Sequence, residues 1–274
     1  MPGAELILQT ETSPFMMSLV LKTSAGNAVI IDGGRPEDLP LLREIVGDSP
    51  VKAWILTHPH MDHISGFVHA VRTGFGNLGP EKVVYRFPPL EFAERTEPAE
   101  AYTLREFYEI EDAIRPIAVR PKEGDRFAVD DLAFTVLLTF EEDDPVVPLR
   151  PGDQNSTGND ASLIFRVEGP RKSVLILGDA GPLEGDRLFA RHWRELRSDI
   201  VQVAHHGHGG VGAEVYIAAA PRTCLWCCPD WLYEEDPYVI PDRLCGTKMT
   251  RLWLDAIGVK DHIVTKDGTQ TVAL

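Results

Sequence analysis

The chain has 274 residues, 43% of them hydrophobic and 25% charged, which is the balance of an ordinary globular protein and excludes a disordered or fibrous one. Its net charge of −15 argues against broad adhesion to nucleic acid or to an anionic membrane. No apolar run approaches the roughly 20 residues of a membrane span, and residues 1–5 begin no signal peptide. We therefore expect a cytoplasmic protein with no membrane partner, forming a single domain over residues 1–274.

The first half of the chain predicts strands that alternate with helices. Short apolar runs bounded by turn residues predict strands at residues 5–11, 18–23, 28–32, 51–56 and 82–87. Apolar residues at helical spacing predict amphipathic helices at residues 36–46 and 62–74 and an acidic helical stretch at 91–114. Residues 127–140 predict two strands about a turn at Asp130 and Asp131.

The second half repeats this pattern after a loop at residues 141–158, which is rich in Asp, Pro and Gly and is expected beside the site. Strands are predicted at residues 162–167 and 173–177 as a hairpin, at 199–204, at 223–228, and at 262–266 and 269–272 as a closing hairpin. Helices are predicted at residues 182–196, 213–220 and 248–257. Strands in both halves, with helices outside them, predict an α/β fold: a four-layer αββα sandwich of two mixed β-sheets flanked by helices.

Four potential metal ligands follow the predicted strand at residues 51–56, namely His58, His60, Asp62 and His63. Two histidines at alternate positions can direct their side chains into one space, while the next two ligands begin a helix and can reach a neighbouring space. Borderline metals such as zinc accept imidazole and carboxylate together, and two-metal hydrolases hold their ions ~3.5–4 Å apart. The motif predicts a metal site; a solvated histidine-rich turn is the alternative.

This motif resembles the signature of the metallo-β-lactamase superfamily. The resemblance extends to the predicted strands that end at Asp32, at Asp179 and at His205-His206-Gly207. The segment from Asn159 to Ile164 is most similar to one branch of that superfamily. That branch contains the hydrolase domain of competence-type DNA-uptake proteins and the bacterial phosphorylcholine esterases.

The resemblance implies two metal positions that share one carboxylate. His58 and His60 would hold the first ion, Asp62 and His63 the second, and Asp179 would bridge both. Asp62 would also act in catalysis by orienting the attacking water; an N-cap of its helix is the alternative role for this residue.

The resemblance also assigns roles to residues around these ligands. Either His205 or His206 would complete the second metal position. Because successive residues of an extended strand point to opposite faces, only one of them can do so, and we favour His205. His208 is the candidate for binding substrate or protonating a leaving group, and Asp32 would support the metal histidines from outside the ligand set.

Two departures from the family pattern concern the substrate side of the site. No histidine occurs between residues 71 and 191, so the middle ligand of the first metal is missing, and Asn159 or Asp160 could supply an oxygen there. A late His-Pro typical of the uptake-protein branch is absent near residues 243–247. Tyr233 and Tyr238 could shape the pocket instead.

The four cysteines lie late in the chain, at positions 224, 227, 228 and 245. Cys224 and Cys227 have the spacing of a zinc knuckle, but no second Cys or His pair follows at the expected interval. We expect buried reduced thiols, with a structural zinc as the alternative.

The resemblance implies a hydrolase with two divalent ions, zinc being favoured and manganese or iron the alternatives. Two bound ions would lower the pKa of a shared water from 15.7 to about 7, which supplies hydroxide at neutral pH. We expect a phosphoester substrate, and thus phosphodiesterase or nuclease-like activity. The acidic composition favours a small-molecule or flexible phosphoester over extended duplex nucleic acid. The alternatives are a carbonyl substrate (lactone, thioester or β-lactam) and a non-catalytic metal-binding protein of the same fold. The sequence leaves the oligomeric state open.

Overall fold

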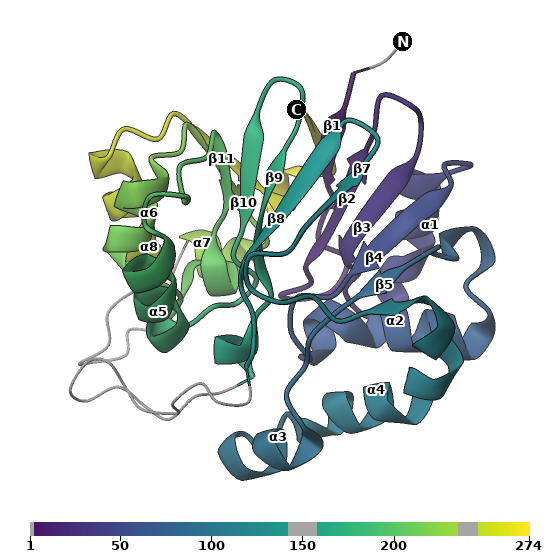
Figure 1. Ribbon diagram of the computed structural model, residues 1–274. Helices are drawn as coiled ribbons and strands as arrows, with labels where there is room; N and C mark the ends of the chain where they lie inside the picture. The colour runs from purple at the N-terminus through teal and green to yellow at the C-terminus, as the bar shows by residue number, and fades with distance from the viewer. Residues whose placement is uncertain (1–2, 142–157, 235–245) are drawn as a thin grey trace.

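The structure is a computed structural model that describes residues 3–141, 158–234 and 246–274 (Figure 1). These residues form two seven-stranded β-sheets that pack face to face, and helices cover the outer face of each sheet. The predicted αββα sandwich of two mixed sheets is confirmed.

The first sheet is built from the N-terminal part of the chain and one C-terminal strand. Its strand order is β14 (Gln270–Ala273), β1 (Glu5–Leu8), β2 (Ser18–Lys22), β3 (Ala28–Asp32), β4 (Val51–Ile55), β5 (Val83–Val84) and β6 (Ala118–Val119). Side chains alternate between the two faces, as a period of two requires. Leu19 and Leu21 enter the core between the sheets, whereas Val20 packs under the outer helices.

Helices α1 (Leu39–Val46), α2 (Met61–Thr73) and α4 (Ala101–Ile114) form the outer layer beside the first sheet (Figure 1). The short helix α3 (Leu90–Thr96) precedes α4, so the helical stretch predicted at residues 91–114 is a pair of helices. Their apolar faces pack on the sheet through the buried side chains of Leu42, Phe67 and Phe107. The apolar spacing noted in the sequence therefore marks the buried face of each helix.

The second sheet is built from strands that are consecutive in the chain. It runs β13 (Asp261–Val264), β12 (Thr223–Trp226), β11 (Ile200–Gln202), β10 (Ser173–Ile176), β9 (Ile164–Glu168), β8 (Leu132–Leu138) and β7 (Arg126–Val129). Helices α5 (Pro182–His192), α6 (Ala213–Ala219), α7 (Asp230–Glu234) and α8 (Thr247–Ala256) lie on its side of the molecule. Leu188, Val215 and Leu254 bury the outer face of this sheet.

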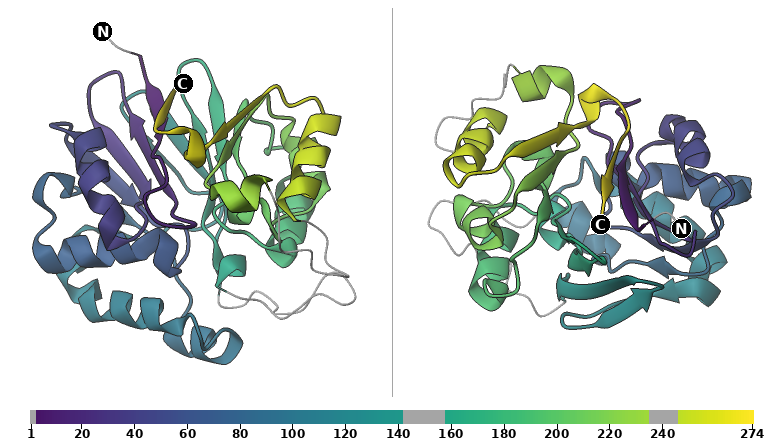
Figure 2. Two further views of the ribbon diagram at one scale, coloured as in Figure 1. Left: turned by 180° about the vertical axis from the view of Figure 1, so that it is seen from behind. Right: turned by 90° about the horizontal axis from the view of Figure 1, so that it is seen from above.

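The closing hairpin predicted from residues 262–272 is wrong. β13 pairs in parallel with β12 in the second sheet, whereas β14 pairs antiparallel with β1 in the first sheet, with Val272 opposite Leu6. Thr265–Asp267 carries the chain from one sheet to the other, which brings the C-terminal strand beside the N-terminal one (Figure 2). Turn residues predict a change of direction but not which strand supplies the hydrogen-bond partners, and here each short strand extends a different sheet.

The predicted ligand segments all follow strands at one end of the sandwich. β3 and β4 are parallel neighbours, and so are β10 and β11, so the carboxyl ends within each pair point the same way. Asp32 ends β3, His58 follows β4, Asp179 follows β10 and His206 follows β11. Most of the loop predicted at residues 141–158 lies outside the described residues.

Candidate metal centre

The turn between β4 and α2 presents the central motif. His60 occupies the N-cap position of α2 in an extended conformation, and Asp62 and His63 lie in the first turn of the helix. No side chain forms the cap hydrogen bond, so the alternative role of Asp62 as an N-cap is wrong. The Asp62 carboxylate instead lies 3.4 Å from Nε2 of His206.

His63 lies between two buried carboxylates. Its Nδ1 is 2.7 Å from Oδ2 of Asp32, and its Nε2 is 3.3 Å from Oδ2 of Asp179. Asp32 accepts hydrogen bonds from the backbone N–H and the hydroxyl of Thr57, both at 2.7 Å. A carboxylate held in this way fixes the orientation of the imidazole and leaves Nε2 for the site.

His206, rather than His205, contacts the Asp179 carboxylate. Nε2 of His206 lies 3.0 Å from Oδ2 of Asp179, while its Nδ1 is 2.7 Å from the carbonyl oxygen of Cys227. Nε2 of His205 lies 3.3 Å from the side-chain nitrogen of Asn159, and His205 is not among the grouped ligand atoms described below.

The reason for preferring His205 does not apply, because the backbone is not extended where the two histidines lie. β11 ends at Gln202, and His205 and His206 both adopt left-handed φ angles, 50° and 54°. The alternation of faces along a strand therefore does not apply to them. The strain of two consecutive left-handed residues is of a kind that concentrates at functional sites.

The ligand atoms form two groups with His63 in common. His58, His63 and Asp179 form one, and Asp62, His63 and His206 the other; within each group the ligand atoms lie within 4.8 Å of one another. His58 places Nε2 3.9 Å from Oδ2 of Asp179 and Nδ1 3.2 Å from the Thr57 hydroxyl. His60 belongs to neither group, and its Nε2 lies 3.0 Å from Oε2 of Glu97.

The polar atoms in this cluster fit a cation. Nε2 of His58 and Oδ1 of Asp179 are buried and have no hydrogen-bond partner among the described residues. Leaving a buried polar group unsatisfied costs about 1–3 kcal/mol, and a divalent ion among these atoms would remove that cost. The mixed imidazole and carboxylate donors suit zinc, and also manganese and iron.

Opposite charges within the cluster offset the free-energy cost of burying its carboxylates and imidazoles. Burial would raise the pKa of Asp179, but His206 and His63 hold that pKa well below its ordinary range. Likewise, His206 and His63 lower the pKa of Asp62 to about 2 despite its burial. In return, Asp179 and Asp62 overcome burial and raise the pKa of His206 to about 10. The metal-free site at neutral pH therefore holds protons that an entering cation must displace.

His58 differs from its neighbours in charge. Burial, and then the nearby His63, hold the pKa of His58 well below its ordinary range. The imidazole is therefore neutral at physiological pH, and its buried Nε2 offers a lone pair to the site without first losing a proton.

Other predicted site residues have different partners. Asp160 accepts a hydrogen bond from the backbone N–H of Glu184, at 3.1 Å, in the first turn of α5. Tyr233 packs edge-on against Trp226, and Tyr238 lies outside the described residues. His208 stacks on His205 with ring centroids 4.5 Å apart.

The electrostatic environment of His208 disfavours the predicted role as a proton donor. Burial, followed by His205 and His206, lowers the pKa of His208 to about 3. The metal-free protein therefore holds His208 neutral at pH 7, with a lone pair but no excess proton to give to a leaving group.

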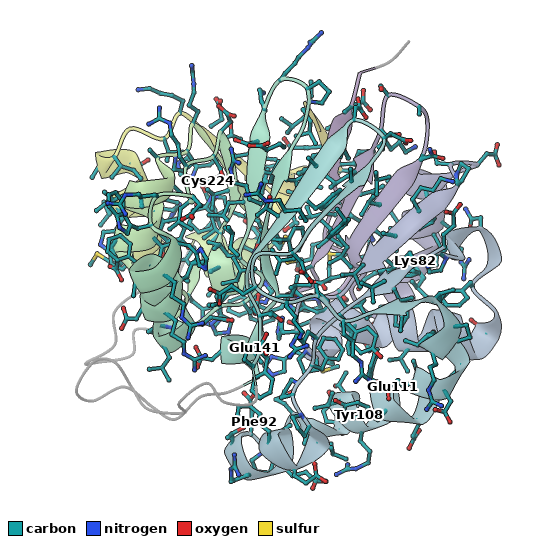
Figure 3. The ribbon with its side chains drawn as sticks, in the orientation of Figure 1. Lys82, Phe92, Tyr108, Glu111, Glu141 and Cys224 are labelled. Atoms are coloured by element: carbon teal, nitrogen blue, oxygen red, sulfur yellow. The ribbon has the colours of Figure 1, made fainter. Side chains whose placement is uncertain are left out.

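The cysteines support the reading as buried thiols. Cys224, Cys227 and Cys228 are all buried, and burial raises the pKa of the Cys224 and Cys227 thiols. A thiol that stays protonated is a poor zinc ligand. Figure 3 shows Cys224 well away from the α3 end of the molecule. Cys245 lies outside the described residues.

Two supporting residues escaped the sequence interpretation. Thr57 forms hydrogen bonds with Asp32 and His58. It directly precedes the motif, so its position next to the first histidine could have indicated this supporting role. Glu97, which contacts His60, lies 37 residues further along the chain, and no spacing rule connects the two.

The His206 assignment can be tested against its neighbour. His206→Ala is expected to lower the affinity for one metal ion by at least tenfold, because it removes the nitrogen closest to Asp179. His205→Ala should retain both ions near wild-type affinity. Metal content and competition with a chelator measure both effects. Loss of metal from the His205 variant alone would reverse the assignment.

Fold and ligand geometry together define a metal-dependent hydrolase. The chain belongs to the metallo-β-lactamase superfamily, whose sequence model matches residues 17–208. The predicted family resemblance is thus confirmed.

Among the described residues, no helix combines the length and apolarity needed to cross a membrane.

One relative and two solved structures illustrate the range of this superfamily. ComE operon protein 3 of Bacillus subtilis is 28% identical over 180 residues, which is 65% of this chain but only 20% of that protein, and fits the predicted competence-type branch. A diphosphatase from the PhnP family is 14% identical with a TM-score of 0.51, and the match covers 99% of this chain and 98% of that one. CmlA, a diiron β-hydroxylase from Streptomyces venezuelae, is 10% identical with a TM-score of 0.55, covering 100% and 55%. At such identities the structures show a shared fold only.

Proposed function

We propose that this chain is a two-metal hydrolase that cleaves a small or flexible phosphodiester, with zinc as the favoured ion and manganese or iron as alternatives. The observation that carries the proposal is the convergence on Asp179 of three imidazoles from two distant segments of the chain. These imidazoles belong to His58, His63 and His206, at 3.9, 3.3 and 3.0 Å. The diphosphatase with the same fold and the likeness to the competence-type branch support a phosphoester substrate.

The protein residues would share the work of holding and orienting the reactants. Asp179 contacts both ligand groups and would bridge them, and Asp62, whose side chain is 17% exposed, would orient the attacking water. Asp32 and the Cys227 carbonyl keep two imidazoles aligned through their outer nitrogens. When bound, divalent ions lower the pKa of a water molecule and stabilise negative charge on the substrate oxygen.

The acidic composition limits the substrate. A formal charge of −15 opposes the tracking of a long polyanion, whose binding needs many cationic contacts. A single phosphodiester needs only the site itself, so we infer a small or flexible substrate. We also infer a cytoplasmic location, since the buried free thiols of Cys224 and Cys227 suit a reducing compartment.

A substrate panel with defined metals tests the proposal. Metal-free protein is reconstituted separately with zinc, manganese and iron and assayed on an aryl phosphodiester, a phosphomonoester, a lactone, a thioester and a β-lactam. We expect two ions per chain and the highest kcat/KM on the phosphodiester. Faster turnover of a carbonyl substrate would select the alternative hydrolase, and two bound ions without any turnover would indicate a non-catalytic protein.

A further inference from the structure

Glu97 makes a polar contact at the metal centre from outside the two sheets. It is the C-cap residue of α3, and its Oε2 lies 3.0 Å from Nε2 of His60 and 2.9 Å from the backbone nitrogen of Gly158. The side chains of His60 and Glu97 are only 13% and 24% exposed. This carboxylate therefore accepts two hydrogen bonds at the boundary of the site.

His60 is held by the opposite ring nitrogen from the other imidazoles. His58, His63 and His206 each contact an outer oxygen through Nδ1 and direct Nε2 toward Asp179. His60 contacts its outer oxygen through Nε2. Because a carboxylate can only accept, the proton of the neutral imidazole must sit on Nε2, and the lone pair on Nδ1.

We propose that Glu97 is the positioning residue of the first metal, holding His60 in the tautomer whose Nδ1 can bind the ion. The part of this inference that concerns metal binding rests on the proposed two-metal function. Ligating histidines ordinarily donate their second N–H to a carboxylate or carbonyl, which fixes the ring and strengthens the ligand. His60 lies outside both ligand groups, but the centroid of its ring is 4.7 Å from that of His58. Glu97 would therefore make His60 available as an additional metal ligand.

Gly158 is an independent observation that this contact is built into the fold. A Cβ at this position would lie 2.6 Å from Nε2 of His60 and 3.1 Å from Oε2 of Glu97. Its φ is −56°, which any residue adopts, so the backbone does not require glycine here. Glycine is required because a side chain would occupy the space of the His60–Glu97 pair.

The origin of Glu97 ties the α3–α4 segment to the metal centre. Phe92 of α3 packs edge-on against Phe140 with ring centroids 5.2 Å apart. Figure 3 shows Phe92 at the lower end of the molecule, the end at which α3 lies in Figure 1. Helix α3 therefore packs against Phe140, which follows β8 of the second sheet. Glu97, at the end of α3, contacts His60, which follows β4 of the first sheet.

The first arm of the test uses the metal-free protein. Nitrogen-15 NMR of labelled histidines, with His60 assigned from His60→Gln, reports which ring nitrogen carries the proton at the alkaline end of its titration. Wild type and the control Glu94→Gln should show the proton on Nε2, and Glu97→Ala should show a mixture of tautomers. Glu94 is the matched control, because it is also in α3 but pairs with Arg105 at the surface.

The second arm measures the affinity for each ion by chelator competition. Glu97→Ala and Gly158→Ala should each weaken one of the two ions by about 10–100-fold and leave the other unchanged. Glu97→Gln should lose less metal affinity than Glu97→Ala, because its amide oxygen still accepts a hydrogen bond from Nε2 of His60, although it carries no charge.

Three results would overturn the role of Glu97. These are a His60 proton on Nδ1 in wild type, an unchanged tautomer in Glu97→Ala, and equal weakening of both ions together with a lower melting temperature. A wild-type protein that binds no divalent ion would defeat the hydrolase proposal instead, while the tautomer measurement would still decide whether Glu97 positions His60.

Discussion

Asp179→Asn is expected to abolish hydrolysis and to remove both metal ions. The Asp179 carboxylate lies close to the Nε2 atoms of both ligand groups, at 3.0 Å from Nε2 of His206 and 3.3 Å from Nε2 of His63. Asparagine keeps the shape but removes the charge, and one amide oxygen cannot bridge two ions. We expect kcat/KM to fall by about 1,000-fold or more, because residues acting as one unit fail together.

Metal content and kinetics measure this loss, and the metal-free variant offers a separate readout. Asp179 is the strongest of the attractive influences that overcome burial and raise the pKa of His206 to about 10, so that pKa should drop in Asp179→Asn. The exposed Asp48→Asn serves as the control for a change of one charge. Two retained ions with activity within tenfold of wild type would show that Asp179 is not the bridge.

Asp62→Ala is expected to stop turnover while the chain stays folded and keeps one ion. The side chain contacts His206 at 3.4 Å and does not cap α2, so its removal costs the helix only the dipole interaction of its first turn. That interaction is worth about 0.3–1 kcal/mol. The loss of one ion removes both nucleophile generation and charge stabilisation, since a two-metal site shares these tasks.

Circular dichroism, thermal melting and elemental analysis of Asp62→Ala separate catalysis from folding. The expected variant melts near the wild-type temperature, carries close to one ion and is inactive on the phosphodiester. His58, His63 and Asp179 remain to hold the ion that stays. Full activity with two ions would end the two-metal mechanism, whereas an unfolded chain would give Asp62 a structural role.

Local sequence determined the parts of the site that lie close together in the chain. His58, Asp62 and His63 fall within six positions at a strand end, so chain geometry alone brings them to one place. Asp32, which ends β3, and Asp179, which follows β10, were identified through the family resemblance of their strand segments. The two-sheet architecture followed from the same alternation of strands and helices.

Tertiary structure decided which strands pair at the edges of the sheets. Residues 261–273 show two short strands about a turn, which is typical of a hairpin, yet the strands join different sheets. Each strand gains its hydrogen bonds from a neighbour more than 30 residues away in sequence, at Thr223–Trp226 or Glu5–Leu8. No local pattern encodes such a choice of partner.

Tertiary structure likewise decided the ligand geometry beyond the local motif. The left-handed backbone at His205 and His206 places His206 against Asp179, an arrangement that a rule based on extended strands does not predict. Glu97 reaches His60 only because α3 and the strand-end turn meet in space. The sequence by itself thus determined the kind of site and its nearest ligands. The choice between neighbouring histidines and the outer supports depended on φ angles and long-range packing, which residue spacing does not carry.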